Sequence, residues 1–194
     1  MQWLRDLILR VNNKYISHKL KKTPSLNSTT YVASPQWLFP LLVGRETMES
    51  IILNHNNIID GLSILKKLPK DQYIDFLIEY YSKGIKQYGK CWKYADIVTV
   101  LNGISQKNEI SNYLEIGVRT GRSMATVANS SPLCDIVGFD MWIEDYAGME
   151  NPGPGDVKEL LKEFGHNGKI ELISGDSTKT VPKYFNDHSN KYFD

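Results

Sequence analysis

The chain has 194 residues and a mass of 22.2 kDa, which suits one main domain with an accessory layer but is short for two full domains. A hydrophobic content of 41% and a charged content of 23% are typical of a globular protein and exclude a fibrous or disordered chain. The net charge of +1 gives no reason to expect a nucleic-acid partner. The sequence has no uninterrupted apolar run of about 18 residues, so we do not expect an integral membrane protein.

The first 22 residues are a basic segment with six Lys/Arg against one Asp. Apolar residues recur there at helical spacing, which predicts an amphipathic arm: Trp3, Leu4, Leu7, Ile8, Val11 and Tyr15. Such an arm can dock on its own domain, on another subunit or on an anionic membrane, and the short apolar stripe favours docking on protein. Because no signal-peptide cleavage site follows, we expect a cytoplasmic protein whose two cysteines stay reduced.

A Pro-containing linker over about residues 23–40 precedes three predicted helices. The helices are expected over 46–68 with an interruption at Gly61, over 71–83 with Gly84 as the C-cap, and over about 92–101 with an end near Asn102. His55 falls on an apolar helix face and is interpreted as a packed residue rather than a ligand. Residues 1–90 are therefore predicted to be a helical N-terminal region that carries the basic arm.

The sequence pattern changes after about residue 110. Three short β-rich runs, YLEIG, DIVGFD and KIELISGD, each end in glycine or an acidic residue. Helices are predicted between them over Arg122 to about Asn129, and from a capping box at Asp156 and Glu159 to just before Gly165. This order predicts an α/β fold, a Rossmann-like parallel sheet with flanking helices over residues 91–194.

The stretch YLEIGVRTGRS, residues 113–123, forms the first strand-to-helix turn, which is where such sheets bind ligands. Gly117 would let the chain turn sharply with ligand atoms close to its backbone. Gly121 would let the next helix begin tight against the strand. The helix N-terminus then offers free N–H groups for a carboxylate or a phosphate.

The side chains of this turn discriminate between nucleotide-type ligands. A P-loop needs Gly-Lys-Ser/Thr, but Arg122 precedes Ser123 here, and Arg119 with Arg122 occupies positions where a dinucleotide fingerprint has glycine. Glu115 would repel a pyrophosphate and attract the ammonium of S-adenosylmethionine. The charge pattern therefore favours S-adenosylmethionine, with Ser123 as a further candidate contact.

The second and third strands also end in acidic residues. Asp140 lies about 20 residues past the glycine turn, where a carboxylate can accept both hydroxyls of a ribose. Met141 and Trp142 follow and are candidates for covering the adenine face. Asp176 and Ser177 end the third strand and are candidates for hydrogen bonds to the adenine edge.

Four segments resemble the class I S-adenosylmethionine-dependent methyltransferases, in the branch of macrocin-type and aminocoumarin-sugar O-methyltransferases: YLEIGVRTGRS, IVGFDMWIEDYAGMENPGPGD, GHNGKIELISGDS and KYFD. The resemblance covers about residues 90–194, and one departure is Arg119, where the common motif has glycine. It implies that the methionine loop comprises Glu115, Gly117 and Gly121, that the ribose residue is Asp140, and that the adenine lies near Asp176 and Ser177.

The resemblance implies O-methylation of a small hydroxylated molecule such as a sugar. It also implies that KYFD opens a fourth strand of a sheet with about seven, so we expect these residues to be part of a longer chain with an incomplete sheet here. That longer protein is where we expect the base or a divalent metal; the chain itself offers no assigned catalytic residue or metal ligand. The exposed sheet edge suggests a homo-oligomer.

Three features stay open at this stage. His166 and His188 are interpreted as loop residues rather than catalytic groups. The loop from Glu144 to Asp156 is either a lid over the acceptor or a stiff connection. The alternative to an enzyme is a non-catalytic nucleotide-binding or interaction module in which the helical N-terminus does the main work.

Overall fold

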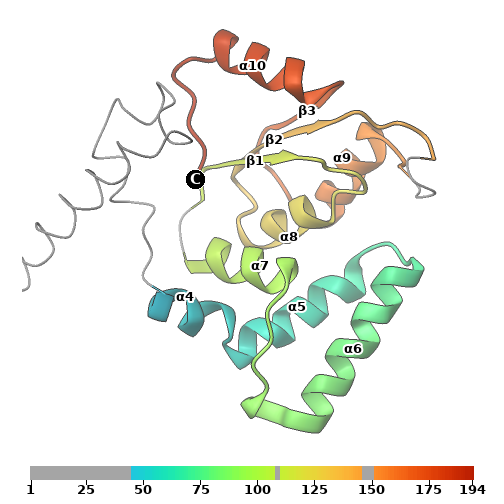
Figure 1. The fold of residues 1–194 in the computed structure, drawn as a ribbon, viewed down its shortest axis with the longest axis vertical. Coiled ribbons are helices and arrows are strands. Elements are labelled where there is room, and N and C mark those ends of the chain that lie inside the picture. Colours follow the sequence, from blue (N-terminus) through green and yellow to red (C-terminus); the bar gives the residue numbers. More distant parts are fainter. Residues whose placement is uncertain (1–44, 108–109, 146–150) are drawn as a thin grey trace, which may run out of the picture. The chain divides into compact units, whose positions relative to one another are not determined.

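The structure is a computed structural model that describes residues 45–107, 110–145 and 151–194 (Figure 1). The predicted basic arm and linker lie outside the described residues, as do residues 146–150 of the Pro/Gly-rich loop. Residues 48–194 form one compact unit. A domain boundary at residue 90 stays a prediction. None of the described helices is long and apolar enough to cross a bilayer.

The first part of this unit is helical, as expected. Its elements are α4 (Arg45–Ile52), α5 (His55–Lys67), α6 (Gln72–Tyr88), the short 3-10 helix η3 (Gly89–Cys91) and α7 (Ile97–Lys107). The predicted interruption at Gly61 is wrong, because the chain breaks at Asn54, whose side chain accepts the Asn56 N–H and caps α5. Gly61 instead lies inside α5, where the Tyr81 side chain packs closely against it.

Two other predicted helix ends are also wrong. Helix α6 passes through Gly84 and ends only at Gly89, which has the left-handed φ of 54°. The ring of Trp92 packs on Gly84 so closely that a Cβ atom there would lie 2.3 Å from it. The tertiary contact, rather than a turn, explains this glycine.

Helix α7 begins later than predicted and continues through Asn102. The side chain of Asp96 accepts the N–H groups of Val98 and Thr99, at 2.9 and 3.0 Å, and so sets the start of the helix. Asn102 is buried and donates a 2.8 Å hydrogen bond to the Asn57 side chain of α5. A residue type that favours helix ends is thus retained inside α7 because it is paired across a helix contact.

The second part is the predicted α/β unit. Parallel strands β1 (Asn112–Ile116), β2 (Asp135–Asp140) and β3 (Ile170–Ser174) form a sheet in the order β1-β2-β3. The connecting helices are α8 (Arg122–Ser130) and α9 (Pro154–Glu163), and β3 is followed by α10 (Ser177–Asp187). Figure 1 shows α8 and α9 on one face of the sheet and α10 on the other. The predicted Rossmann-like fold class is confirmed.

Each face of the sheet has its own apolar cluster. The larger cluster joins the α8–α9 face to α5, α6 and α7, and includes Met124, Ile136 and Leu161. The smaller one packs Val137, Phe139 and Tyr184 between β2 and α10. Successive strand residues alternate between the two clusters, as the period of a strand requires.

Helix α9 follows a different start signal from the one predicted. Its N-cap is Gly153 and its first residue is Pro154, so the capping box at Asp156 and Glu159 is wrong. The predicted end is confirmed, since the helix stops at Glu163 and Gly165 has φ of 80°.

The C-terminal KYFD forms no strand, but its last residue lies beside β1 (Figure 1). The Asp194 N–H donates to the Asn112 carbonyl at 2.9 Å, and its side chain accepts the N–H groups of Ser111 and Asn112. The Ser111 carbonyl instead accepts the Asp135 N–H of β2. Asp194 therefore lies at the edge of β1 that faces away from β2. The fourth strand that the resemblance implied for KYFD is not formed by these residues.

We expect Gly84→Ala to lower the free energy of unfolding by about 1–3 kcal/mol, because the new methyl group would overlap the Trp92 ring. Gly155 is the matched control: it is also helical, and a Cβ there meets nothing within 4 Å. Gly155→Ala should leave stability unchanged or raise it by up to about 1 kcal/mol. Chemical denaturation measures both, and equal effects would contradict the packing assigned to Trp92.

Candidate functional site

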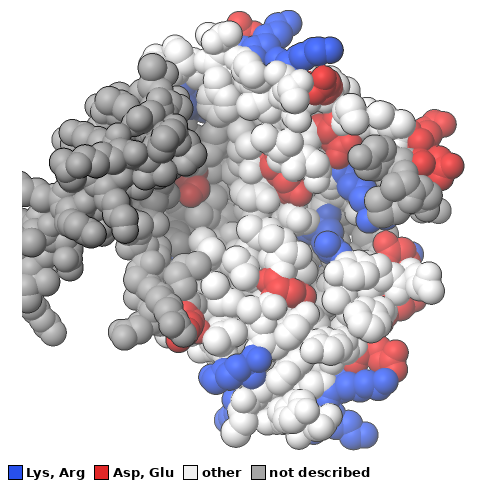
Figure 2. All heavy atoms as spheres, viewed as in Figure 1, with Lys and Arg blue, Asp and Glu red and all other residues white. Residues whose placement is uncertain are grey.

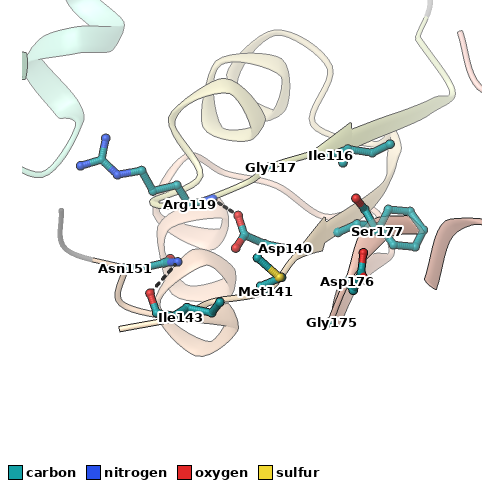
Figure 3. A pocket seen from close by; sticks show the side chains of 11 residues that line it. Ile116, Gly117, Arg119, Asp140, Met141, Ile143, Asn151, Gly175, Asp176 and Ser177 are labelled. Atoms are coloured by element: carbon teal, nitrogen blue, oxygen red, sulfur yellow. Dashed lines mark hydrogen bonds between the residues drawn. The ribbon is translucent and has the colours of Figure 1, made fainter. Parts of the chain in front are cut away.

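A cavity of about 380 Å³ opens at the carboxyl ends of the three strands (Figure 3). Its volume lies in the range of small-molecule sites. It is lined by Ile116, Gly117, Arg119, Phe139, Asp140, Met141, Ile143, Asn151, Gly175, Asp176 and Ser177. Five of the nine predicted cofactor residues are among them: Gly117, Asp140, Met141, Asp176 and Ser177. The other four, Glu115, Gly121, Ser123 and Trp142, lie outside this lining.

The two glycines of the first turn have different tasks. Gly117 has φ of 87°, and a Cβ added there would meet nothing within 4 Å, so its backbone faces open space in the cavity wall. Gly121 has φ of 78°, and a Cβ there would lie 2.9 Å from Val157 of α9. Gly117 therefore leaves room for a ligand, while Gly121 allows helix α9 to approach the turn.

The Asp140 carboxylate holds two backbone N–H groups at the floor of the cavity. Its Oδ2 atom accepts the Arg119 N–H at 2.8 Å, and its Oδ1 atom accepts the Trp142 N–H at 2.7 Å (Figure 3 draws the first). Each carboxylate oxygen has two lone pairs, so one acceptor position on each oxygen is left. Asp140 can thus hold the loop and accept hydroxyl groups at the same time.

Glu115 lies beneath the turn rather than in the cavity wall. Burial raises the pKa of its carboxyl to about 7, and the nearby Asp140 charge acts in the same direction. Hydrogen bonds from Tyr113, at 2.9 Å, and from Ser123, together with the charge of Arg122, lower the pKa and offset part of this rise. Ser123 is therefore placed as a partner of Glu115.

Met141 and Trp142 diverge although they are neighbours. Met141 lines the cavity and is 46% exposed, so it is available to an apolar ligand group. Trp142 packs against the large core cluster, and its indole N–H donates to the Arg119 carbonyl at 3.3 Å. Its indole lies behind the wall of the site, and the predicted adenine contact stays a prediction.

Asp176 has a structural role besides lining the cavity. Its Oδ1 atom accepts the Thr178 N–H at 2.9 Å and the Thr178 hydroxyl at 2.7 Å, which caps α10. These hydrogen bonds from Thr178 hold the pKa of Asp176 below its usual value. Ser177, the first residue of α10, lies beside it in the lining (Figure 3).

Sequence reasoning missed six lining residues: Ile116, Arg119, Phe139, Ile143, Asn151 and Gly175. Ile116 and Phe139 could have been found, since they stand at the carboxyl ends of strands. Asn151 carries no such signal and comes from the Pro/Gly-rich loop. Its amide N–H donates to the Ile143 carbonyl at 3.4 Å, while its Oδ1 atom is buried without a hydrogen-bond partner in the described part of the chain.

The histidines singled out from the sequence lie elsewhere. His166 is buried in the turn before β3, where its Nε2 atom lies 2.8 Å from the Cys134 carbonyl at the amino ends of the strands. His188 follows α10, and its Nδ1 atom lies 2.9 Å from the Tyr184 carbonyl. Within residues 45–107, 110–145 and 151–194, no group of three or more His, Cys, Asp or Glu could hold a metal ion.

Charges on the face seen in Figure 2 are mixed. Acidic and basic side chains alternate with uncharged ones, and the described part of this face carries no extended patch of one sign.

Comparison with known proteins gives likenesses among solved structures. No protein-family model matches the chain, and neither does any curated protein. A solved structure from Klebsiella pneumoniae, of a protein provisionally assigned as an O-methyltransferase, is similar at 15% identity with a TM-score of 0.32. The match covers 76% of this chain and 51% of that one, so the chain spans about half the length of that protein.

The raised pKa of Glu115 predicts a pH-dependent cost to stability. Because its pKa is about 7 in the fold and 4.5 for an unperturbed glutamate side chain, the native state holds this proton more tightly, and stability falls as pH rises from 4.5 to 7. Glu115→Gln should remove this loss and raise the free energy of unfolding at pH 8 by about 1–3 kcal/mol, with little change near pH 4.5. Urea denaturation across this pH range measures the difference.

Glu79 supplies the control for that experiment. It is exposed on α6, paired with Lys83, and its pKa is lowered chiefly by the hydrogen bond to that lysine. Glu79→Gln should therefore bring no gain in stability at pH 8. A Glu115→Gln protein with the wild-type pH profile would show that Glu115 is not the buried acid described above.

Proposed function

We propose that the chain is the S-adenosylmethionine-binding part of a methyltransferase that O-methylates a small hydroxylated molecule such as a sugar. The observation that carries this proposal is the cavity at the carboxyl ends of β1, β2 and β3, where Asp140 faces the open backbone of Gly117. A cytoplasmic location and self-association belong to the same proposal. The proposal also includes a catalytic base or a divalent metal in the longer protein.

The polar groups around the cavity suit a ligand with hydroxyl and ammonium groups rather than phosphates. Two carboxylates, Asp140 and Asp176, line it against one cation, Arg119, and the Glu115 carboxyl lies under the turn. Carboxylates repel a pyrophosphate and accept hydrogen bonds from a ribose or an ammonium. This supports S-adenosylmethionine, which carries an ammonium and no phosphate.

The start of α8 is suited to the carboxylate of such a ligand. Its N-cap is Gly121, which has no side chain to satisfy the first free N–H groups of the helix. Those groups and the helix dipole favour a negative charge. Glu115 lies under the same turn, so the turn behind the cavity wall offers one group for each charge of an amino acid.

The apolar part of the lining supports the placement of a flat ring. Ile116, Phe139, Met141 and Ile143 contribute apolar surface around Asp140. Of these, Ile116, Met141 and Ile143 are each about half exposed and line the same cavity, so they form an apolar surface that a ligand can cover.

When bound, S-adenosylmethionine supplies a methyl group on a sulfonium, which an acceptor hydroxyl can attack in line. The contribution proposed for the described residues is grip and orientation. Asp140 would hold the ribose and Glu115 would hold the ammonium. Gly117 would let the ligand come close to the backbone. Holding reacting groups in line accounts for a large share of catalysis in such reactions.

Calorimetric titration with S-adenosylhomocysteine tests the proposal. The wild-type chain should bind, and Asp140→Ala should bind at least about tenfold more weakly, because a carboxylate that accepts hydroxyl hydrogen bonds is lost. Asp135→Ala is the matched control, since Asp135 lies at the other end of the same strand. No binding by the folded wild-type chain would refute the proposal. Binding without methyl transfer in any longer form of the protein would favour the non-catalytic module.

The same ligand should bind more tightly as pH rises. An ammonium beside Glu115 favours its charged form, so binding lowers a pKa that is about 7 in the free protein and releases a proton. Affinity should therefore increase from pH 6 to pH 8, by up to about tenfold per pH unit below the pKa. Titrations in buffers of different ionisation enthalpy count the released proton. Glu115→Gln should bind more weakly without this dependence, and an unchanged pH profile in that variant would refute the contact.

A further inference from the structure

Two residues next to the cavity adopt a backbone conformation that favours glycine. Arg119 has φ of 53° and Trp142 has φ of 43°. For a residue with a side chain this left-handed conformation is costly, because Cβ approaches the following carbonyl. Arg119 also stands where the resembled motif has glycine. The surrounding structure must therefore hold Arg119 in place.

Both peptide groups of Arg119 are held by side chains at the end of β2 and just after it. Its N–H donates to the Asp140 carboxylate at 2.8 Å. Its carbonyl accepts the indole N–H of Trp142 at 3.3 Å. Trp142 is in turn tied to the other oxygen of Asp140 through its own N–H, at 2.7 Å. The three residues form a closed ring of hydrogen bonds, which we name the Arg119 clamp.

The Trp142 indole is a suitable anchor for the Arg119 clamp. Trp142 packs against the large core cluster, which also contains residues of α8 and α9. A side chain packed in this way loses little further freedom when it forms its hydrogen bond. The indole N–H of Trp142 is thus a fixed donor, and it positions the Arg119 carbonyl with respect to the core.

We propose that Trp142 is a positioning residue that, through the Arg119 clamp, holds the turn of residues 117–121 in the shape that binds the ligand. The identity of the ligand rests on the proposed function, but the clamp does not. Arg119 and Asp140 line the cavity, whereas Trp142 stands behind it. Release of the indole hydrogen bond would let Arg119 leave its left-handed conformation and move the cavity wall.

The clamp also links the turn to ligand binding. Asp140 uses one acceptor position of each oxygen for the clamp and keeps the other for hydroxyl groups. A ligand that bonds to this carboxylate therefore contacts the group that orients Arg119. The shape of the turn and the grip on the ligand depend on one side chain.

Trp142→Phe and Arg119→Gly together test the proposal. Trp142→Phe keeps an aromatic ring in the core but removes the N–H, and it should weaken S-adenosylhomocysteine binding by about tenfold. Arg119→Gly removes the need for the clamp, because glycine adopts the left-handed conformation without cost. Trp142→Phe should therefore weaken binding by no more than about twofold in the Arg119→Gly background. If Trp142→Phe leaves binding unchanged in the wild type, or weakens it equally in both backgrounds, the proposal is wrong.

Asp145→Gly is the matched control. Asp145 is also a left-handed residue, with φ of 53°, but it does not line the cavity. In the Trp142→Phe background it should not restore binding. Restoration equal to that by Arg119→Gly would show a general gain in stability and would overturn the clamp.

Thermal unfolding separates this proposal from the proposed function. Arg119→Gly should raise the melting temperature less in the Trp142→Phe background than in the wild type, whether or not the ligand binds, because Arg119 has already left its strained conformation there. If the wild type does not bind S-adenosylhomocysteine but this coupling is present, the proposed function fails and the clamp stands. Equal shifts in both backgrounds overturn the clamp. If Trp142→Phe does not fold, the double variant should still fold, and an equally unfolded double variant also overturns it.

Discussion

Parallel pairing of β1, β2 and β3 is the constraint on which the rest of the structure depends. Residues that are far apart in the sequence, such as Gly117, Asp140 and Asp176, end successive strands and therefore meet at one edge of the sheet. In a parallel sheet this edge collects all the turns that lead from strands into helices. The cavity and its carboxylates follow from this arrangement.

At that edge, side chains with structural roles are also the ones proposed to bind the ligand. Asp140 orients two backbone amides as well as facing the cavity, and Asp176 caps α10 as well as lining it. A carboxylate has enough acceptor positions for both tasks. A structural hydrogen bond and a ligand contact on the same carboxylate are therefore compatible with each other.

Glu115 shows the opposite relation between stability and function. A partly buried acid beneath the turn costs stability when it is charged, and its pKa of about 7 reflects this cost. Tyr113 and Ser123 offset only part of it through their hydrogen bonds. A group that is retained at such a cost is a reasonable place to look for a ligand charge.

The sequence by itself determined the three strands, the glycine turn, helix α8 and the helical nature of the first part, because these depend on local periodicity and on residues with special backbone freedom. Only the tertiary structure decided the helix ends at Asn54 and Gly89, the place of Trp142 behind the wall and the entry of Asn151 into the lining. The physical reason is that these features depend on partners distant in sequence. Gly84 looks like a helix end until the Trp92 ring is seen against it, and Arg119 looks like a poor substitute for glycine until Asp140 and Trp142 are seen to hold it.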